Sequence, residues 1–260
     1  MRKLLFAASL LGCMAFGHGG GTPCVVGKGA FTSAVLAPGP VVWYRCNELT
    51  GASMADSSGN ARNGSYSGSP TLGSTGLTRD WGNCVNPNTS IVTASGKFGS
   101  VGTTSWINLD KFTLIVFVLS GATNGTNAFI FGSMGSALDS GFGVYRAANQ
   151  TYFSALLYTS AGLENFNAST SITNGAAHML TYLFNGTKVE LHTDTAVDLA
   201  ATSTSSTIIT YSTSTVQVGA TGGPAFDLPW NYNVSDCILY SYTITGAQET
   251  AIYNASVGLP

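Results

Sequence analysis

The sequence predicts an all-β fold in which two antiparallel sheets pack face to face as a sandwich. From about residue 40 onward, short apolar or alternating runs rich in β-branched and aromatic residues recur, each bounded by Gly, Asn, Asp or Ser. Helical periodicity is nearly absent. The chain has 260 residues, of which 44% are hydrophobic, so it is long enough to bury one sizeable core. We therefore expect a single sandwich domain.

The expected strands follow from these runs in chain order. They comprise residues 41–45, 112–118, 129–131, 143–145, 152–158, 178–184, 189–192, 216–219 and 237–240. The clearest hairpin pairs residues 178–184 with 188–192, because Asn185-Gly186 between them is typical of a turn whose two central residues both have positive φ. One short helix is expected over residues 245–253, where Thr245 can cap a turn that carries Gln248 and Glu249.

The first 34 residues are expected to lie outside the sandwich, which then spans residues 35–260. Met1-Arg2-Lys3 and the apolar run that follows have the basic and apolar regions of a secretory signal, and Leu10-Leu11-Gly12-Cys13 resembles the cleavage site of a bacterial lipoprotein. A Gly-rich joint comes next. Two interpretations stay open: a signal that is removed, or an uncleaved apolar arm that inserts into a neighbouring subunit.

The composition limits the classes of partner that the protein is expected to bind. Charged residues are only 8% of the chain, the formal net charge is -2, and Lys and Arg form no cluster beyond Arg2-Lys3, so nucleic acid is not an expected partner. Few charges and many small polar residues lower the desolvation penalty when copies pack against one another. We therefore expect a homo-oligomer, and of the symmetric forms a trimer.

The cysteines leave their pairing open. Their spacing matches no metal or redox motif. In an oxidising compartment Cys46 and Cys84 would cross-link the first strands, whereas otherwise each cysteine is a buried thiol. The residues to be assigned are Cys24, Cys46, Cys84 and Cys237, with Cys13 in the lipoprotein-like segment.

Residues 43–51 (WYRCNELTG), followed by residues 56–66 (DSSGNARNGSY), resemble the opening of the laminin-G-like, concanavalin A-like lectin and glucanase jelly rolls. Later landmarks occur in the family's order: the strand at 112–118, the histidine-containing hairpin at 178–194, and a last strand with a short helix at 235–252. The resemblance implies an antiparallel jelly-roll sandwich with an extended N-terminal arm, and it implies fold more firmly than function. The stretch before Trp43 is also similar to modules of tailed-phage virion proteins.

Catalysis is not expected. Glycosidases of this fold carry two carboxylates a few residues apart on one strand, because acid and nucleophile flank the scissile bond at about 5 Å. The sequence has no Glu-x-Asp-x-x-Glu run, and we interpret its isolated glutamates as solvated or turn-stabilising: Glu48, Glu164, Glu190 and Glu249. His178 and His192 are interpreted as strand or surface residues, since no G-x-S-x-G nucleophile motif accompanies them.

Two short segments are candidate binding sites. Asp56 and Asn60 offer hard oxygen ligands for calcium, although Asp and Asn next to Gly also close turns by bonding to their own backbone. Asp194-Thr195 stands where the resembled family often has Asp-Gly, which weakens the case for calcium at that turn. Otherwise no cofactor is expected.

The second segment is a candidate glycan site made of Trp230, Asn231, Tyr232 and Asn233. An aromatic ring stacks on the apolar face of a sugar while neighbouring amides hydrogen-bond its hydroxyls. The alternative is that Trp230 is buried in a loop under the sandwich.

Two functions fit these observations. The first is a non-enzymatic structural protein on the virion surface of a tailed phage, such as a capsid decoration protein, a fibre subunit or a tail adhesin that binds host-surface glycans. In this hypothesis residues 1–40 attach the sandwich to other virion proteins. The second is a secreted or lipid-anchored lectin-like protein of the bacterial cell envelope, motivated by Cys13. A glycan hydrolase is the least favoured alternative.

Overall fold

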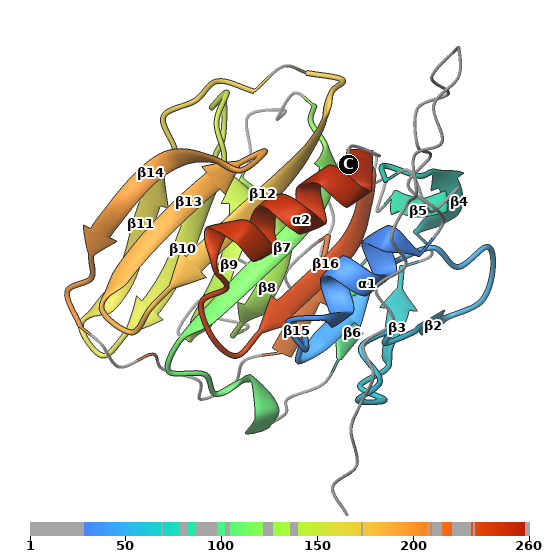
Figure 1. Ribbon diagram of the computed structural model, residues 1–260, viewed down its shortest axis with the longest axis horizontal. Helices are drawn as coiled ribbons and strands as arrows, with labels where there is room; N and C mark the ends of the chain where they lie inside the picture. Colours follow the sequence, from blue (N-terminus) through green and yellow to red (C-terminus); the bar gives the residue numbers. More distant parts are fainter. Residues whose placement is uncertain are drawn as a thin grey trace, which may run out of the picture.

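The computed structural model describes residues 29–68, 70–78, 83–86, 98–101, 105–121, 127–135, 140–172, 174–206, 209, 215–219, 230 and 232–257. These residues form two antiparallel sheets packed face to face, with one short helix near each end of the described chain (Figure 1). The predicted all-β sandwich is confirmed. Residues 1–28, and with them most of the expected N-terminal arm, lie outside the described residues.

Each sheet draws on strands from both halves of the chain. Sheet A contains, in spatial order, β14 (Ala196–Ser203), β13 (Lys188–Thr193), β12 (Ala177–Phe184), β7 (Phe112–Leu119), β16 (Val234–Tyr240), β5 (Asn83–Asn86) and β4 (Thr71–Thr75), and β1 (Val42–Tyr44) also pairs with β16. Sheet B contains β11 (Gly162–Asn167), β10 (Ser154–Thr159), β9 (Gly141–Arg146), β8 (Ala128–Met134), β15 (Thr215–Val218), β6 (Phe98–Val101), β3 (Gly64–Ser67) and β2 (Ser53–Met54). A 3-10 turn, η1 (Ser105–Ile107), precedes β7.

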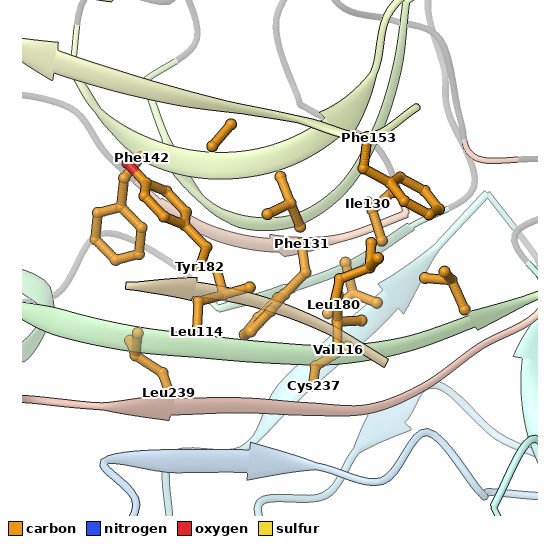
Figure 2. Close-up of a cluster of buried hydrophobic side chains, with 14 of the residues drawn as sticks. Leu114, Val116, Ile130, Phe131, Phe142, Phe153, Leu180, Tyr182, Cys237 and Leu239 are labelled. Atoms are coloured by element: carbon orange, nitrogen blue, oxygen red, sulfur yellow. The ribbon is translucent and has the colours of Figure 1, made fainter. Parts of the chain in front are cut away.

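The main core fills the space between the sheets. Figure 2 shows side chains of the two sheets pointing toward one another, with Leu114, Val116 and Tyr182 on one side and Phe131 and Phe142 on the other. Every one of these side chains is at most 3% exposed, in keeping with alternating inward-facing residues on the strands of a sandwich. The packing of aromatic residues in this layer fixes the distance between the two sheets.

The outer face of sheet A is covered by helices. Helix α2 (Gly246–Val257) lies across it, with α1 (Ala30–Leu36) beside it (Figure 1). Phe31 of α1 is fully buried and meets Trp43 and Phe117 edge-on, with ring centroids 6.0 and 5.6 Å apart. The sequence predicted no helix here, since seven residues are too short to display a helical period, and the expected boundary after residue 34 falls inside α1.

The hairpin of β12 and β13 is confirmed in register, from Leu180 opposite Thr193 to Phe184 opposite Val189. Its turn differs from the prediction. Only Gly186 has positive φ, at 98°, and the Asn185 side-chain oxygen closes the turn by accepting hydrogen bonds from the N–H groups of Thr187 and Lys188. An Asn side chain can cap a turn in this way without adopting positive φ itself.

A turn with two positive φ angles lies one hairpin later. Asp194 and Thr195, at 52° and 69°, join β13 to β14. Asp194 is held in place because its Oδ1 accepts a hydrogen bond from Met179 N at 2.8 Å and its Oδ2 lies 2.7 Å from Nδ1 of His178. The left-handed backbone at Thr195 is therefore imposed by its neighbours rather than favoured by its own side chain.

Helix α2 matches the prediction at its start and runs further at its end. The Gln248 side chain accepts hydrogen bonds from both N and Oγ1 of Thr245, and Gln248 N donates back to Thr245 Oγ1, which is a capping box. The helix continues to Val257. None of the helices in the described part of the chain is long and apolar enough to cross a membrane.

The three cysteines of the described chain, Cys46, Cys84 and Cys237, are free and buried. Of the two alternatives for Cys46 and Cys84, the cross-link is not formed, and both thiols lie in the packed core as small apolar groups. Burial raises the pKa of the Cys84 thiol to about 12, so this group stays protonated at neutral pH. Cys13 and Cys24 lie outside the described residues.

Candidate functional site

Several loops meet at one end of the sandwich. The connections from β7 to β8, β9 to β10, β11 to β12 and β15 to β16 all start and finish there, as the strand registers require. Backbone hydrogen bonds tie them together, including Leu119 N to Asn233 O at 2.9 Å and Ser120 N to Ala176 O at 2.8 Å. We call this region the loop end. It comprises the described residues of segments 120–127, 147–153, 168–176 and 219–233.

Asp198 of β14 fixes one of these loops. Its Oδ1 accepts hydrogen bonds from Ser169 N at 3.0 Å and Thr170 N at 2.6 Å, and its Oδ2 accepts one from Thr193 Oγ1 at 2.9 Å. Burial acts to raise the pKa of Asp198, but the hydrogen bonds from Thr170, Thr193 and Ser169 outweigh it and hold the pKa below its ordinary value. The loop end is thus braced by an ionised carboxylate from the neighbouring sheet.

The predicted glycan residues occupy different environments. Trp230 is only 1% exposed and packs into the main core against Phe153, with ring centroids 6.0 Å apart. A stacking platform needs an exposed ring face, so Trp230 follows the stated alternative, burial under the sandwich, and not the glycan-stacking role. Its Nε1 is buried without a hydrogen-bond partner among the described residues. Asn231 lies outside the described residues.

Tyr232 and Asn233 do remain at the surface of the loop end, both half-buried. The Tyr232 ring lies directly against the backbone of Gly121, where a Cβ would stand 1.8 Å from Cζ of the ring. Glycine is therefore required at position 121 for the ring to take this place. Asn233 Nδ2 donates to the Thr75 carbonyl at 3.0 Å, which fixes the segment that carries Tyr232.

A buried arginine that we did not predict lies behind Tyr232. Arg146, the last residue of β9, is 2% exposed. Its Nε donates to Gln150 O at 2.9 Å, and its Nη1 donates to Gly121 O and, at 3.4 Å, to Asn174 Oδ1. All three acceptors are uncharged. Burial lowers the pKa of Arg146, partly offset by Tyr232, but the group stays cationic at neutral pH.

Amide side chains surround this arginine and tyrosine. Asn149 and Asn174 are exposed, and Asn127, Gln150 and Asn233 are half-buried. They come from all the loops that meet at the loop end, which explains why no sequence motif linked them. Each amide offers both donors and an acceptor, so together they can satisfy the hydroxyl groups of a polar ligand.

Asp56 and Asn60 form a closed turn. Oδ1 of Asp56 accepts hydrogen bonds from Trp43 N at 3.1 Å and Ser58 N at 2.9 Å, and Oδ2 accepts from Ser58 Oγ and Arg62 N, both at 2.9 Å. Asn60 Nδ2 donates to the Val41 carbonyl at 2.9 Å. Within the described residues, no group of three His, Cys, Asp or Glu side chains is arranged to hold a metal ion.

The remaining glutamates are not all isolated, which corrects one expectation. Glu249 of α2 is 2% exposed, and its Oε2 lies 2.7 Å from Nδ1 of His192. Glu190 Oε1 lies 3.1 Å from Nε2 of the same histidine. Sequence spacing could not reveal this cluster because Glu249 reaches His192 only when α2 packs on sheet A. His192 is a strand residue of β13, one of the two interpretations offered above, and it is half-buried beneath α2.

Glu48 and Glu164 stabilise loops, as expected for turn-stabilising carboxylates. Glu48 accepts hydrogen bonds from Ala55 N at 2.8 Å and Tyr66 Oη at 2.7 Å, while Glu164 accepts from Thr159 Oγ1 at 3.1 Å and Ser205 N at 2.8 Å. Close to Glu48, an open groove of about 400 Å³ runs between β3 and β4, lined in part by Leu49, which is 66% exposed. The groove is a second surface on which a ligand could lie.

Solved structures similar to this chain include toxin binding domains and a sialidase. The binding domain of Paraclostridial Mosquitocidal Protein 1 has a TM-score of 0.66 at 13% identity, with 85% of this chain and 53% of that chain covered. The botulinum neurotoxin serotype D ligand binding domain, in complex with N-acetylneuraminic acid, has a TM-score of 0.59 at 12% identity, covering 86% and 52%. Trypanosoma rangeli sialidase has a TM-score of 0.59 at 12% identity, covering 84% and 33%.

These similarities define the fold class, an all-β sandwich of a kind that occurs in toxin binding domains. At 10 to 13% identity they show the fold alone. The chain spans about half the length of the toxin domains and a third of the sialidase, so what those whole proteins bind does not transfer directly. No protein-family model and no curated protein matches the sequence.

Proposed function

We propose that this protein is a non-catalytic carbohydrate-binding module whose ligand surface is the loop end. The observation that carries the proposal is the half-buried Tyr232 on loops that also carry exposed and half-buried amides, of which Asn174 and Asn149 are exposed. A ring with an open edge packs on the apolar side of a sugar, and amides exchange hydrogen bonds with its hydroxyls. Asp198 fixes the 168–176 loop and backbone hydrogen bonds tie the loops to one another, so little ordering entropy is lost on binding.

The fold supports a binding role. Two of the similar structures are toxin binding domains, one of them solved with N-acetylneuraminic acid, and the sialidase acts on a glycan. The carboxylates also support a non-catalytic role, because Glu48, Asp56, Glu164, Asp194 and Asp198 each accept hydrogen bonds that hold loops or turns. A general acid or nucleophile has to be available to the substrate instead.

A glycan-binding measurement with matched variants tests this proposal. Tyr232→Ala is expected to weaken glycan affinity about tenfold, the loss typical of an aromatic anchor. Tyr158→Ala is the control, because Tyr158 is equally half-buried but lies at the opposite end of β10. Leu49→Ala tests the groove between β3 and β4. Loss of binding in Leu49→Ala with Tyr232→Ala unchanged would move the site to the groove, and no glycan binding by the unmodified protein would refute the proposal.

Calcium enters the same assay as a variable. Binding through amides and an aromatic ring needs no metal ion, so chelation by EGTA is expected to leave glycan affinity unchanged. A loss of affinity that added calcium restores would instead support a calcium site at Asp56 and Asn60.

We further propose that the module sits on the virion surface of a tailed phage, as a decoration, fibre or adhesin subunit that assembles as a trimer and attaches through residues 1–40. Support comes from the low charge, 8% of residues, and from the similarity of the first strand region to virion modules. The alternative is a lipid-anchored bacterial lectin. Intact-mass analysis of native protein separates them: retained, unmodified residues 1–12 favour the virion setting, and a lipid on Cys13 after their loss favours the envelope.

A further inference from the structure

Arg146 is a buried cation with no opposite charge beside it in the described chain. Its guanidinium donates to Gln150 O, Gly121 O and Asn174 Oδ1, all of which are neutral. The ion pairs found among the described residues all involve His178 or His192, and none of them includes Arg146. A charge that is removed from water without a partner is costly, so a site of this kind is stabilised by an incoming anion.

The Arg146 guanidinium contacts a residue that is itself exposed to solvent. Asn174 is exposed, and its Oδ1 contacts Nη1 of Arg146 at 3.4 Å, which is long for a charge-assisted hydrogen bond. This contact is therefore the weakest of the three that Arg146 makes. A carboxylate that displaces the Asn174 amide oxygen would replace a long neutral contact with a short ionic one.

A second buried donor points to the same ligand chemistry. Trp230 Nε1 is buried and has no acceptor among the described residues, and its ring contacts Tyr232, with centroids 5.7 Å apart. Tyr232 in turn is an electrostatic neighbour of Arg146. The Arg146 guanidinium and the Trp230 N–H are thus two buried donors at the loop end, and donors of this kind suit a ligand that carries negatively charged oxygens.

We infer that the loop end selects acidic sugars, with the sugar carboxylate bound by Arg146 in place of the Asn174 amide and the sugar ring against Tyr232. This inference rests on the proposed glycan binding and adds the class of ligand. A planar carboxylate matches the fork of donors on a guanidinium, which is why arginine recognises carboxylates by two parallel hydrogen bonds.

The test compares acids with their own esters. Oligosaccharides that end in a uronic or sialic acid are titrated into the full-length protein beside their methyl esters, which remove the charge and keep the ring. The free acid is expected to bind about tenfold more tightly than the ester, since a charge-assisted hydrogen bond is worth about one such factor. Sulfated sugars form a third arm, and tighter binding of sulfate than of carboxylate would overturn the assignment to a carboxylate.

Two variants localise the effect. Arg146→Gln is expected to bind acid and ester equally, whereas Arg62→Gln, which alters a half-buried arginine over Trp106, keeps the preference. Asn174→Asp covers the case in which Arg146→Gln fails to fold. It places a carboxylate beside Arg146, so it is expected to raise the melting temperature and to abolish the preference for acids.

The outcomes separate the inference from the proposed function. Equal binding of acid and ester by the unmodified protein overturns the inference while glycan binding stands. An Asn174→Asp variant with unchanged melting temperature and unchanged preference also overturns it, because Arg146 would then already be neutralised within the chain. If no sugar of either kind binds, the proposed function fails together with the inference.

Discussion

Two cationic side chains, buried Arg146 at the loop end and half-buried His192 beneath α2, have opposite surroundings in this fold. His192 lies between two carboxylates, with Glu249 Oε2 at 2.7 Å and Glu190 Oε1 at 3.1 Å. Arg146 donates only to neutral oxygens. His192, paired with carboxylates, helps to hold α2 on sheet A. Arg146, with no charged partner among the described residues, contacts the exposed amide of Asn174. From this comparison we infer that Arg146, the cation with no opposite charge beside it in the described chain, is the one that binds a ligand.

The largest expected effect on stability comes from removing a carboxylate that pairs with His192. Glu249→Gln removes the buried carboxylate that pairs with His192 and is expected to lower the free energy of unfolding by about 3 kcal/mol, measured by urea denaturation at pH 6. Glu164→Gln, which alters a carboxylate that only braces a loop, is expected to cost less than about 1 kcal/mol. A loss in Glu249→Gln no larger than in this control would contradict a structural ion pair.

The pH dependence of that variant sharpens the same comparison. Burial acts to lower the pKa of His192, but the hydrogen bonds to Glu249 and Glu190 outweigh it and raise the pKa. A raised folded-state pKa stabilises the fold fully below the ordinary histidine value of about 6.5, and this contribution is lost as the pH rises through the raised pKa. The difference between the unmodified protein and Glu249→Gln is therefore expected to shrink from pH 6 to pH 9.

At the loop end, Gly121→Ala is expected to lower both glycan binding and stability. A Cβ at this position would meet the Tyr232 ring at 1.8 Å, so the ring has to move away from its place beside Arg146. Overpacking of this kind costs about 2 kcal/mol of folding free energy. Glycan affinity is expected to fall as far as in Tyr232→Ala, and full retention of affinity would show that the position of the ring does not matter.

A buried carboxyl group, that of Asp236, provides a third case to compare with Arg146 and His192. Burial raises the pKa of Asp236 to about 7, although Trp43 Nε1 and Thr78 Oγ1 donate to its carboxyl group at 3.0 and 3.2 Å. Since the folded pKa lies above the unfolded value, stability falls as the pH rises from about 4 to 7. Asp236→Asn cannot ionise, so it is expected to exceed the unmodified protein in stability at pH 8 and to match it at pH 4.

The smallest expected effect on stability concerns the turn that joins β13 to β14, close to His192. Thr195 adopts φ 69°, a left-handed conformation that costs a threonine about 1 kcal/mol and a glycine nearly nothing. Thr195→Gly is therefore expected to raise the midpoint of thermal unfolding by a few degrees. Asn185→Gly is the control with the opposite sign, because Asn185 closes its turn through its side chain.

The sequence predicted the strands with long apolar runs and missed α1 and several strands whose side chains are small or polar. Residues 112–118 and 178–184 are apolar or alternating runs, and both are strands of sheet A. β4 and β14 escaped prediction because Thr, Ser, Gly and Ala dominate them and most of their side chains stay exposed or half-buried. Such strands form because their neighbours offer hydrogen bonds, which is information that their own side chains do not carry.

The candidate site was predictable only in part. Tyr232 and Asn233 stand next to each other in the sequence, so their aromatic and amide character was visible. Arg146 was not, because its neighbours Gly121 and Asn174 are 25 and 28 residues away and come together only through the strand registers. The burial of Trp230 likewise follows from its position between the sheets rather than from its local sequence.

The most direct single measurement is the ratio of the affinities of the unmodified protein for one acidic oligosaccharide and for its methyl ester. If Arg146 binds the sugar carboxylate, the acid binds about tenfold more tightly than the ester, and this ratio of affinities falls to about one in Asn174→Asp. A ratio of about one in the unmodified protein would contradict the claim that the unpaired charge at the loop end is kept for a ligand.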